Sequence, residues 1–296
     1  MKKIIVVTGG CGFVGANLIE FLLIKTKLRI ISLDDYSSGT KKNHIINKRV
    51  KYIKGSTENI NKILLRYIKL IDVIFHFGEF SRIYQSFIQM NKCIQSNTIG
   101  TNAVFNFCLK HKIKLIYSAT SASLGNRGND KNLSPYAFTK AKNLELLENM
   151  KKWFKFKFEV IYFYNVYGPG QISKGKMSTV IGIFEDAYKN NKPLPVVKPG
   201  TQTRRFTHID DTIKICYIAW KKNLSRHYSI SSKQSHSILD VARMFSSKIK
   251  ILEKRPGERY ASALTSMNLS NKVHKYFGKI KLIDYVNDFK SKNKKY

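Results

Sequence analysis

A glycine-rich turn near the start of the chain has the spacing of a pyrophosphate-binding site. Residues 8–15 read Thr-Gly-Gly-Cys-Gly-Phe-Val-Gly, a G-x-x-G-x-x-G pattern. The turn follows a strand-like run and opens a helix-like one, so backbone N–H groups and the helix dipole can face a phosphate. Glycine also permits the tight turn and the close approach of a dinucleotide, although a purely structural turn is the alternative. The contacts predicted here are Gly9, Gly12, Phe13, Val14 and Gly15.

An acidic residue follows the next predicted strand at the distance expected for a ribose contact. Asp34 lies 22 positions after Gly12, where a carboxylate can accept both ribose hydroxyls of the adenosine. No arginine follows closely that could pair with a 2′-phosphate, which favours NAD over NADP. Asp34 could instead only start the turn at residues 37–39. We predict that Asp34 and Ser37 contact the NAD cofactor.

A tyrosine and a lysine four residues apart, Tyr136 and Lys140, would share one face of a helix. Such pairs arise by chance in a lysine-rich chain. Only Tyr136 follows Ser134-Pro135, which is typical of a helix start, shortly after a predicted strand and the hydroxyl residue Thr120. The other pairs with this spacing are Tyr188/Lys192 and Tyr217/Lys221.

These residues require a scaffold of alternating strands and helices. Short β-branched runs, typical of buried parallel strands, alternate with stretches of helical apolar spacing. This alternation predicts an α/β fold with a Rossmann-type, doubly wound parallel sheet. The predicted strands are 4–7, 29–33, 50–53, 73–75, 114–117 and 159–163, and the predicted helices are 14–25, 58–68, 91–110 and 135–152.

The pattern changes after about Tyr167, where glycines and prolines at 168–170 and 192–195 break the chain into short elements. We predict a Rossmann domain at 1–166 and a smaller, mainly substrate-binding α/β lobe at 167–296. Segments around 205–235 are expected to pack back on the first domain.

Charge is the most unusual feature of the composition. The 296 residues include 53 Lys and Arg against 19 Asp and Glu, a formal net charge of +34. Such a charge can indicate a nucleic-acid or membrane partner. The lysines, however, are spread from Lys2 to Lys295 among many Ile and Asn residues, which indicates an overall compositional bias. We predict no nucleic-acid partner, but a general attraction for anionic substrates.

The spacing of cysteines, histidines and apolar residues does not fit a disulfide-rich, metal-binding or membrane-spanning protein. The four cysteines show no CxxC pairing, and the seven histidines lack a metal-site spacing such as H-E-x-x-H. His76 has the setting of a core residue at a strand end. No apolar run approaches the roughly 18 to 20 residues of a membrane span. We predict a cytoplasmic protein with no metal and no membrane partner.

Four further segments match the sequence pattern of a known family, together with the motifs above. The chain resembles the extended short-chain dehydrogenase/reductase family, in its NAD-dependent sugar-nucleotide epimerase and dehydratase branch, and is most like UDP-sugar 4-epimerases. The resemblance spans nearly the whole sequence. The segments are 34–39, 97–101, 164–171 and 202–211.

The resemblance implies a catalytic triad of Tyr136, Lys140 and Thr120. In that family the tyrosine is the acid/base, the lysine lowers its pKa and holds the nicotinamide ribose, and a Ser or Thr hydroxyl completes the set. The physics agrees, because a phenol with a pKa of about 10 accepts a proton at neutral pH only where nearby cations favour the phenolate. Lys140 and the oxidised nicotinamide would provide that charge.

The residues after Thr120 distinguish the reactions of this branch. Dehydratases that resemble this chain carry Asp-Glu there, and decarboxylases keep the Glu, whereas here the pair is Ser121-Ala122. Small residues resemble the 4-epimerases, in which a sugar hydroxyl, here that of carbon 4, is oxidised transiently and hydride returns to the other face. The alternatives are a nucleotide-sugar reductase or dehydrogenase, or a non-catalytic NAD-binding protein.

The resemblance also implies binding residues and partners. Asn97 would contact the cofactor, and Thr120, Asn165, Arg204 and Arg255 would contact a nucleotide-diphosphate sugar. Exposed arginines could instead be ordinary surface charge, and Asn165 a turn residue. Guanidinium groups suit a diphosphate. Helices 91–110 and 135–152 would form a homodimer through residues such as Phe105, Leu109 and Leu144. The alternative is that these residues serve only the internal core.

Three departures from the family affect the expected pockets. Ser56 stands where an Asp often contacts the adenine, and Leu264 stands where another Asp is common. The segment 126–133 is shorter than in relatives, which predicts a more open active site.

Overall fold

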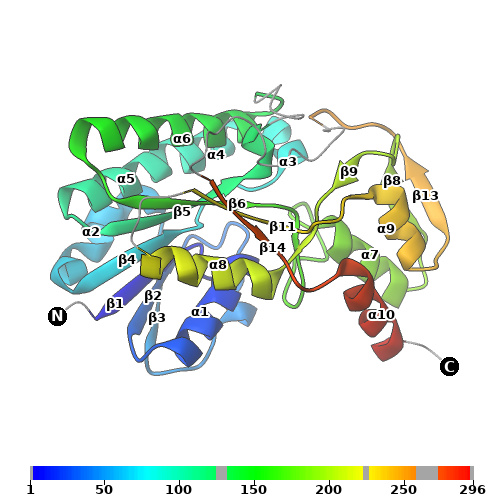
Figure 1. Ribbon diagram of the computed structural model, residues 1–296, viewed down its shortest axis with the longest axis horizontal. Coiled ribbons are helices and arrows are strands. Elements are labelled where there is room, and N and C mark those ends of the chain that lie inside the picture. The colour runs from blue at the N-terminus through cyan, green and yellow to red at the C-terminus, as the bar shows by residue number, and fades with distance from the viewer. Residues whose placement is uncertain (1–2, 125–131, 223–226, 258–272, 294–296) are drawn as a thin grey trace.

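A single parallel sheet organises the protein, as the computed structural model shows for residues 3–124, 132–222, 227–257 and 273–293 (Figure 1). Its eight strands lie in the order β14-β11-β6-β5-β4-β1-β2-β3, and every neighbouring pair is parallel. The order reverses between β1 and β4, which is the switch point where doubly wound sheets bind ligands. The strands are β1 (Ile4–Thr8), β2 (Arg29–Asp34), β3 (Val50–Lys54), β4 (Ile71–His76), β5 (Lys114–Thr120), β6 (Phe158–Phe163), β11 (His227–Ser231) and β14 (Val273–Phe277).

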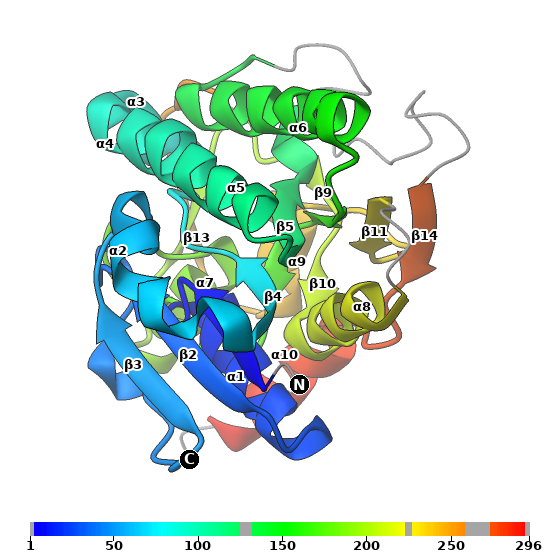
Figure 2. The same ribbon diagram turned by 90° about the vertical axis from the view of Figure 1, so that its left-hand side faces the viewer.

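Helices cover both faces of the sheet because each central strand is apolar on both sides (Figure 2). In β1, Ile4 and Val6 belong to the core under one helical layer, and Ile5 and Val7 belong to the core under the other. The first layer contains α2 (Ile60–Leu64), α5 (Thr101–Lys110) and α6 (Pro135–Phe154), and the second contains α1 (Phe13–Lys25) and α8 (Ile209–Lys222). The Rossmann-type prediction is therefore confirmed.

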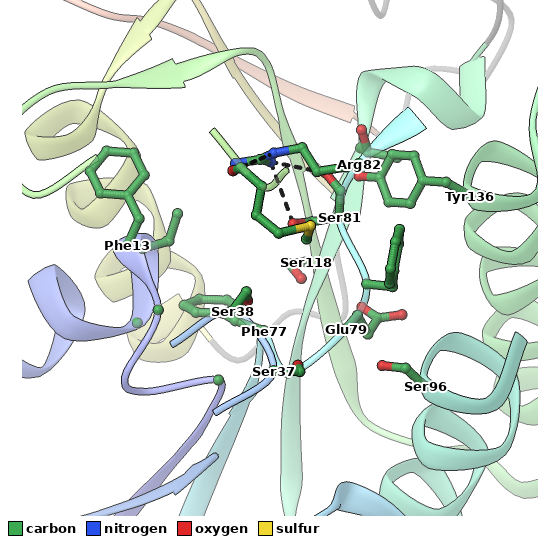
Figure 3. Close-up of a pocket in the computed structure, with 18 of the residues that line it drawn as sticks. Phe13, Ser37, Ser38, Phe77, Glu79, Ser81, Arg82, Ser96, Ser118 and Tyr136 are labelled. Carbon is green, nitrogen blue, oxygen red and sulfur yellow. Dashed lines mark hydrogen bonds between the residues drawn. The ribbon is translucent and has the colours of Figure 1, made fainter. Parts of the chain in front are cut away.

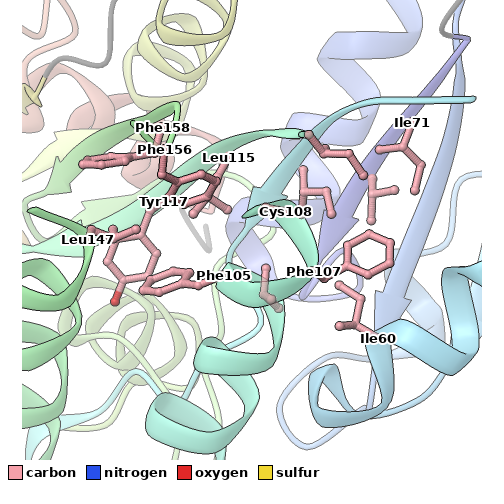
Figure 4. Close-up of a cluster of buried hydrophobic side chains, with 14 of the residues drawn as sticks. Ile60, Ile71, Phe105, Phe107, Cys108, Leu115, Tyr117, Leu147, Phe156 and Phe158 are labelled. Atoms are coloured by element: carbon pink, nitrogen blue, oxygen red, sulfur yellow. The ribbon is translucent and has the colours of Figure 1, made fainter. Parts of the chain in front are cut away.

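Aromatic side chains dominate the core beneath α5 and α6 (Figure 4). Phe105 on α5 lies fully buried, with its ring centroid 5.4 Å from that of Tyr117 on β5 in an edge-to-face arrangement. Leu147 on α6 and Phe158 on β6 pack in the same cluster. This packing holds α5 and the second half of α6 against β5 and β6, the elements that also carry Thr120 and Tyr136.

The predicted helix 91–110 is a continuous helical stretch with an irregular centre. It comprises α4 (Met90–Ile94), a π-helical segment (Gln95–Gly100) and α5. Such π segments frequently occur at functional sites. The predicted helix 58–68 is shorter than expected, because α2 is flanked by 3₁₀ turns at Thr57–Asn59 and Leu65–Leu70.

A smaller lobe lies beside the carboxyl ends of the strands, on the right of Figure 1. Its core is built from residues such as Phe184, Val196, Val241 and Phe245. The two final strands of the main sheet, β11 and β14, also come from this half of the chain. The remaining elements are α3 (Ile83–Ile88), β7 (Val166–Tyr167), α7 (Val180–Lys189), β8 (Leu194–Val197), β9 (Thr203–Arg204), β10 (Thr207–His208), β12 (His236–Ser237), α9 (Ile238–Met244), β13 (Ile249–Leu252) and α10 (Leu282–Lys292).

The close contact between α1 and the turn before it depends on Gly15. A Cβ at Gly15 would lie 2.2 Å from the carbonyl oxygen of Gly9. We expect Gly15→Ala to lower the stability by about 1 to 3 kcal/mol and to weaken NAD binding, measured by thermal melting and calorimetry. Gly12→Ala is the matched control, because its Cβ would lie 3.3 Å from the same oxygen and should lower the melting temperature less. Equal melting of Gly15→Ala and the wild type would contradict the packing role.

Candidate active site

A cavity of about 760 Å³ opens at the carboxyl ends of β1, β2, β4, β5 and β6, facing the smaller lobe. The Rossmann side contributes the glycine turn, Asp34, Thr120, Tyr136 and Lys140. The smaller lobe contributes residues 176–181 and Arg204. A cavity of this size suits a cofactor or a drug-sized ligand, although a dinucleotide with a nucleotide sugar would fill it and extend to its mouth.

The glycine turn has the backbone conformation and clearance that a pyrophosphate needs. Gly9 has a φ of +67°, which favours glycine. Gly9, Gly12 and Gly15 line the cavity together with Phe13 and Val14. No side chain caps the amino end of α1 at Gly12, so backbone N–H groups there can bind an anion.

Asp34 lies at the end of β2, buried at the wall of the cavity. One carboxylate oxygen accepts a hydrogen bond from the backbone N–H of Cys11 at 2.8 Å, and the other accepts from that of Tyr36 at 2.8 Å. Burial raises the pKa of Asp34, and these two bonds oppose that rise. The carboxylate is thus held rigidly and retains lone pairs for the ribose hydroxyls. Ser37 and Ser38 line the cavity next to it.

Asp34→Asn should weaken NAD binding about 10-fold or more, because a hydrogen bond to a charged acceptor contributes about 1.5 to 3 kcal/mol. NADP should lose less affinity, since its 2′-phosphate is repelled by the carboxylate. Asp288→Asn is the control, because Asp288 is an exposed residue of α10 that pairs with Lys292 and does not line the cavity. Calorimetric titration of both cofactors measures the effect, and an unchanged NAD affinity in Asp34→Asn would refute the ribose contact.

The sequence places Tyr136 in the first turn of α6. The Ser134 side chain caps this helix by accepting a hydrogen bond from the Ala137 N–H at 3.0 Å, and Pro135 occupies the first turn. Tyr136 therefore lies in the first turn, and Lys140 follows one turn later on the same face. Both residues line the cavity, and Figure 3 shows the Tyr136 ring pointing into it.

Lys140 has a buried acidic partner that the sequence did not indicate. Its ammonium donates to the carboxylate of Glu79 and to the carbonyl oxygen of Ser118. The lysine and glutamate side chains are 4% and 2% exposed. The other Glu79 oxygen accepts from the hydroxyls of Thr101 at 3.0 Å and Tyr117 at 3.1 Å. Burial lowers the pKa of Lys140, and the Glu79 charge opposes this.

His76 extends this network behind the cavity. The His76 ring is fully buried, with Nδ1 2.7 Å from the Thr8 hydroxyl and Nε2 3.0 Å from the Thr101 hydroxyl. Because Thr101 donates to Glu79, its oxygen accepts from Nε2–H, which assigns the neutral tautomer. The expectation that His76 is a core residue at a strand end agrees with this position.

His76 should make the fold sensitive to acid. Burial lowers the pKa of His76 from 6.5 to about 4, so the unfolded chain binds a proton that the folded chain refuses. Stability should therefore fall as the pH is lowered from about 6.5 to about 4, by roughly 3 kcal/mol. Urea unfolding at several pH values measures this slope, and His76→Gln, which cannot titrate, is the control. Equal pH slopes in the two proteins would contradict the assignment.

The described residues directly after β5, 121–124, offer hydroxyls but no carboxylate. The Thr120 hydroxyl accepts from the Ala122 N–H at 3.1 Å, and Ser121 and Ala122 are both buried in the cavity wall. Ala122 packs in one apolar cluster with Tyr136 and Phe80. This part of the site can orient a sugar hydroxyl, whereas it contains no group for general acid or base chemistry.

Some of the predicted substrate-binding and cofactor-binding residues line the cavity, and others do not. Asn165 and Arg204 line the cavity. Asn97 is buried behind the cavity wall, where its amide bonds to the backbone of Phe80 and to Thr139. Arg255 does not line the described cavity, and its guanidinium lies over the ring of Tyr84, 5.2 Å from the centroid. Leu264 and most of the segment 126–133 lie outside the described residues.

Comparison with known proteins decides the family. The model of the NAD dependent epimerase/dehydratase family matches residues 5–231. The chain belongs to this family. The epimerase/dehydratase family comprises NAD-dependent enzymes, and the match covers both the glycine turn and the Tyr136–Lys140 pair.

Relatives in the epimerase/dehydratase family include both reaction types. A dTDP-D-glucose 4,6-dehydratase of Dictyostelium discoideum is 29% identical over 81% of this chain, which spans 60% of that relative's length. An uncharacterized UDP-glucose epimerase of Bacillus subtilis is 28% identical over 81% of this chain and 80% of its own length. The structure of a UDP-glucuronic acid 4-epimerase from Bacillus cereus, solved with UDP-glucuronic acid and NAD, superimposes with a TM-score of 0.83 at 25% identity, covering 98% of this chain and 99% of that one.

NAD is the cofactor of this epimerase/dehydratase family member, and the site fits it. Gly9, Gly12 and Gly15 line the cavity at the uncapped amino end of α1, where backbone N–H groups can bind the pyrophosphate, and Asp34 presents a carboxylate for the ribose. At the predicted adenine end, where Ser56 replaces an Asp, Ser56 and Glu58 both line the cavity. Glu58 can therefore supply a carboxylate there.

Sequence reasoning missed Glu79 and Arg82, which line the cavity between β4 and α3. One signal was present, because charged residues just after a parallel strand lie at the ligand-binding edge of the sheet. Within the described parts of the chain, no helix is long and apolar enough to cross a membrane. The same residues contain no group of three or more His, Cys, Asp or Glu side chains that could hold a metal ion.

Proposed function

We propose that this protein is an NAD-dependent nucleotide-sugar 4-epimerase, and that UDP-hexoses are the first substrates to test. The observation that carries the proposal is the combination of Tyr136, Lys140 and Thr120 around one cavity with Ser121 and Ala122 beside them. The triad suits oxidation of a sugar hydroxyl. The absence of an acid/base pair after Thr120 disfavours elimination of water, which a dehydratase needs.

In the proposed reaction, the Tyr136 phenolate accepts the proton of the sugar 4-hydroxyl, and Thr120 orients that hydroxyl. Bound NAD supplies the acceptor for the hydride of carbon 4 and the donor for its return. Tyr136 then gives the proton back to the oxygen after the ring has turned. Asn165 and Arg204 bind the nucleotide-diphosphate part of the substrate while the sugar ring rotates. Their contribution to the rate is to position the substrate, since they supply no reactive group.

The decisive experiment follows UDP-glucose with purified protein and NAD by NMR, together with absorbance at the nicotinamide band. Appearance of UDP-galactose without net NADH is the expected result. Stoichiometric NADH formation would support the dehydrogenase alternative. Binding of NAD and nucleotide sugar without turnover would support the non-catalytic alternative. A product that has lost water would identify a dehydratase.

We also propose a cytoplasmic homodimer. The four cysteines are free and buried, as suits a reducing compartment. Phe105 lies inside the core and cannot reach a partner, which corrects its expected role in the dimer. Ile99 and Phe138 on the same helical layer are 49% and 41% exposed and supply apolar area for an interface instead. Light scattering coupled to gel filtration tests this assembly.

A further inference from the structure

Arg82 lies in the cavity on the segment between β4 and α3. Its Nε donates to the carbonyl oxygen of Met177 at 2.8 Å, and its Nη1 donates to that of Ser81 at 3.0 Å. Ser81 belongs to the Rossmann side, and Met177 belongs to the smaller lobe. The two bonds therefore fix the orientation of the guanidinium, and Figure 3 shows Arg82 and Tyr136 on the same side of the cavity.

The charge of Arg82 lacks a counter-ion within the described residues. The ion pairs there include none with Arg82, and no acceptor bonds its Nη2. Lys140, by contrast, has the carboxylate of Glu79 as its counter-ion. The Arg82 side chain is half-buried beside the apolar cluster that contains Phe80 and Met177. A partly desolvated charge without a counter-ion costs free energy, which an anionic ligand would offset.

Arg82 is also placed near the reacting end of the substrate. Arg82 lines the same cavity as Tyr136, whose hydroxyl meets the sugar 4-hydroxyl in the proposed function (Figure 3). A group that Arg82 reaches must then lie on a carbon close to carbon 4. In a hexose, the carbon 6 substituent is attached to the neighbouring carbon 5, and a carboxylate there matches the planar guanidinium in shape and charge.

We propose that Arg82 is a specificity-determining residue that selects nucleotide sugars with a carboxylate at carbon 6, that is, uronic acids. This inference rests on the proposed nucleotide-sugar function and names the substrate class. The bonds to Ser81 and Met177 prepare the guanidinium for the carboxylate, because they hold it in one orientation before the ligand arrives. The overall positive charge of the chain favours the encounter.

The test compares UDP, UDP-glucose and UDP-glucuronic acid by calorimetry on the NAD-saturated protein. Wild type should bind UDP-glucuronic acid about 10- to 100-fold more tightly than UDP-glucose, as expected for charge-assisted hydrogen bonds. Arg82→Met should remove that difference and leave UDP binding unchanged. Arg82→Lys should keep part of it, because a lysine retains the charge without the fork. Arg243→Met, on the exposed surface of α9, is the matched control and should behave like wild type.

The outcomes that contradict the Arg82 subsite differ from the outcome that contradicts the UDP-sugar function. Equal binding of the two sugars by wild type would exclude a carboxylate subsite. An equal loss of all three ligands in Arg82→Met would place Arg82 on the diphosphate. Failure of all three ligands to bind wild type would count against the UDP-sugar function itself, whereas turnover of UDP-glucose without a uronate preference would contradict the Arg82 subsite alone. Thermal melting of Arg82→Lys and Arg82→Met verifies that both variants are folded.

Discussion

Tyr136→Phe should reduce kcat about 10²- to 10⁴-fold, which is the range that general acid–base catalysis contributes. The variant keeps the aromatic ring in the first turn of α6 and removes only the hydroxyl that exchanges a proton with the sugar. NAD affinity should change little, because Asp34 and the glycine turn remain intact. Turnover of a nucleotide sugar followed by NMR measures kcat, and calorimetry measures the NAD affinity.

Tyr188→Phe provides a matched control for that substitution. Tyr188 forms the same four-residue spacing with Lys192, but it lies on α7, where its ring packs beside Phe245 in the core of the smaller lobe. Its loss of a hydroxyl should leave kcat within a few-fold of wild type. If Tyr136→Phe retained a comparable activity, Tyr136 would not be the proton acceptor.

Glu79→Gln should destabilise the fold by about 3 to 5 kcal/mol, since it leaves the buried Lys140 without its counter-ion. Removing the carboxylate also removes the charge that opposes the lowering of the Lys140 pKa by burial. A lysine with a depressed pKa in the folded state contributes stability above its unfolded pKa and loses it as the pH falls. The deficit of Glu79→Gln should therefore shrink as the pH is raised above 9. Urea unfolding at pH 7 and above pH 9 measures it.

An exposed ion pair on the same helix as Lys140 provides a control. It shows how much stability is lost when a glutamate charge is removed without burial. Glu145 pairs with Lys142 on α6, and these side chains are 61% and 57% exposed. Glu145→Gln should cost no more than about 1 kcal/mol, because solvent screens the pair. A second comparison is Glu79→Gln with Lys140→Met, where removal of both charges should recover much of the stability. Equal costs for Glu79→Gln and Glu145→Gln would show that the Glu79 pair is not a buried counter-ion.

The parts of the fold that depend on local patterns could be predicted from the sequence. The β-branched run at the start of the chain and the glycine turn after it are contiguous, and β1 and α1 begin within a residue of their predicted positions. The last two strands of the sheet, β11 and β14, were not predicted. Their sequences, His-Tyr-Ser-Ile-Ser and Val-His-Lys-Tyr-Phe, mix polar and apolar residues, and their place in the sheet comes from long-range pairing.

The same distinction applies to the site. Tyr136 and Lys140 could be singled out because a helix start and a four-residue spacing are visible in one segment. The place of Glu79 just after β4 was a signal, but its pairing with Lys140 could not be predicted, because the two residues are 61 positions apart and the ion pair exists only once the end of β4 meets α6. The orientation of Arg82 likewise could not be predicted, because it depends on a hydrogen bond to Met177 of the other lobe, 95 positions away.

The late position of β11 and β14 in the chain has a consequence for synthesis on the ribosome. When translation has passed Phe163, six strands of the sheet are available, but the outer edge of β6 still presents unpaired backbone N–H and C=O groups beside a mainly apolar strand. That edge is covered only after β11 emerges and is followed by β14. The nascent protein therefore exposes an aggregation-prone edge strand, β6, while the smaller lobe is being synthesised. Molecular chaperones have this defined segment to shield.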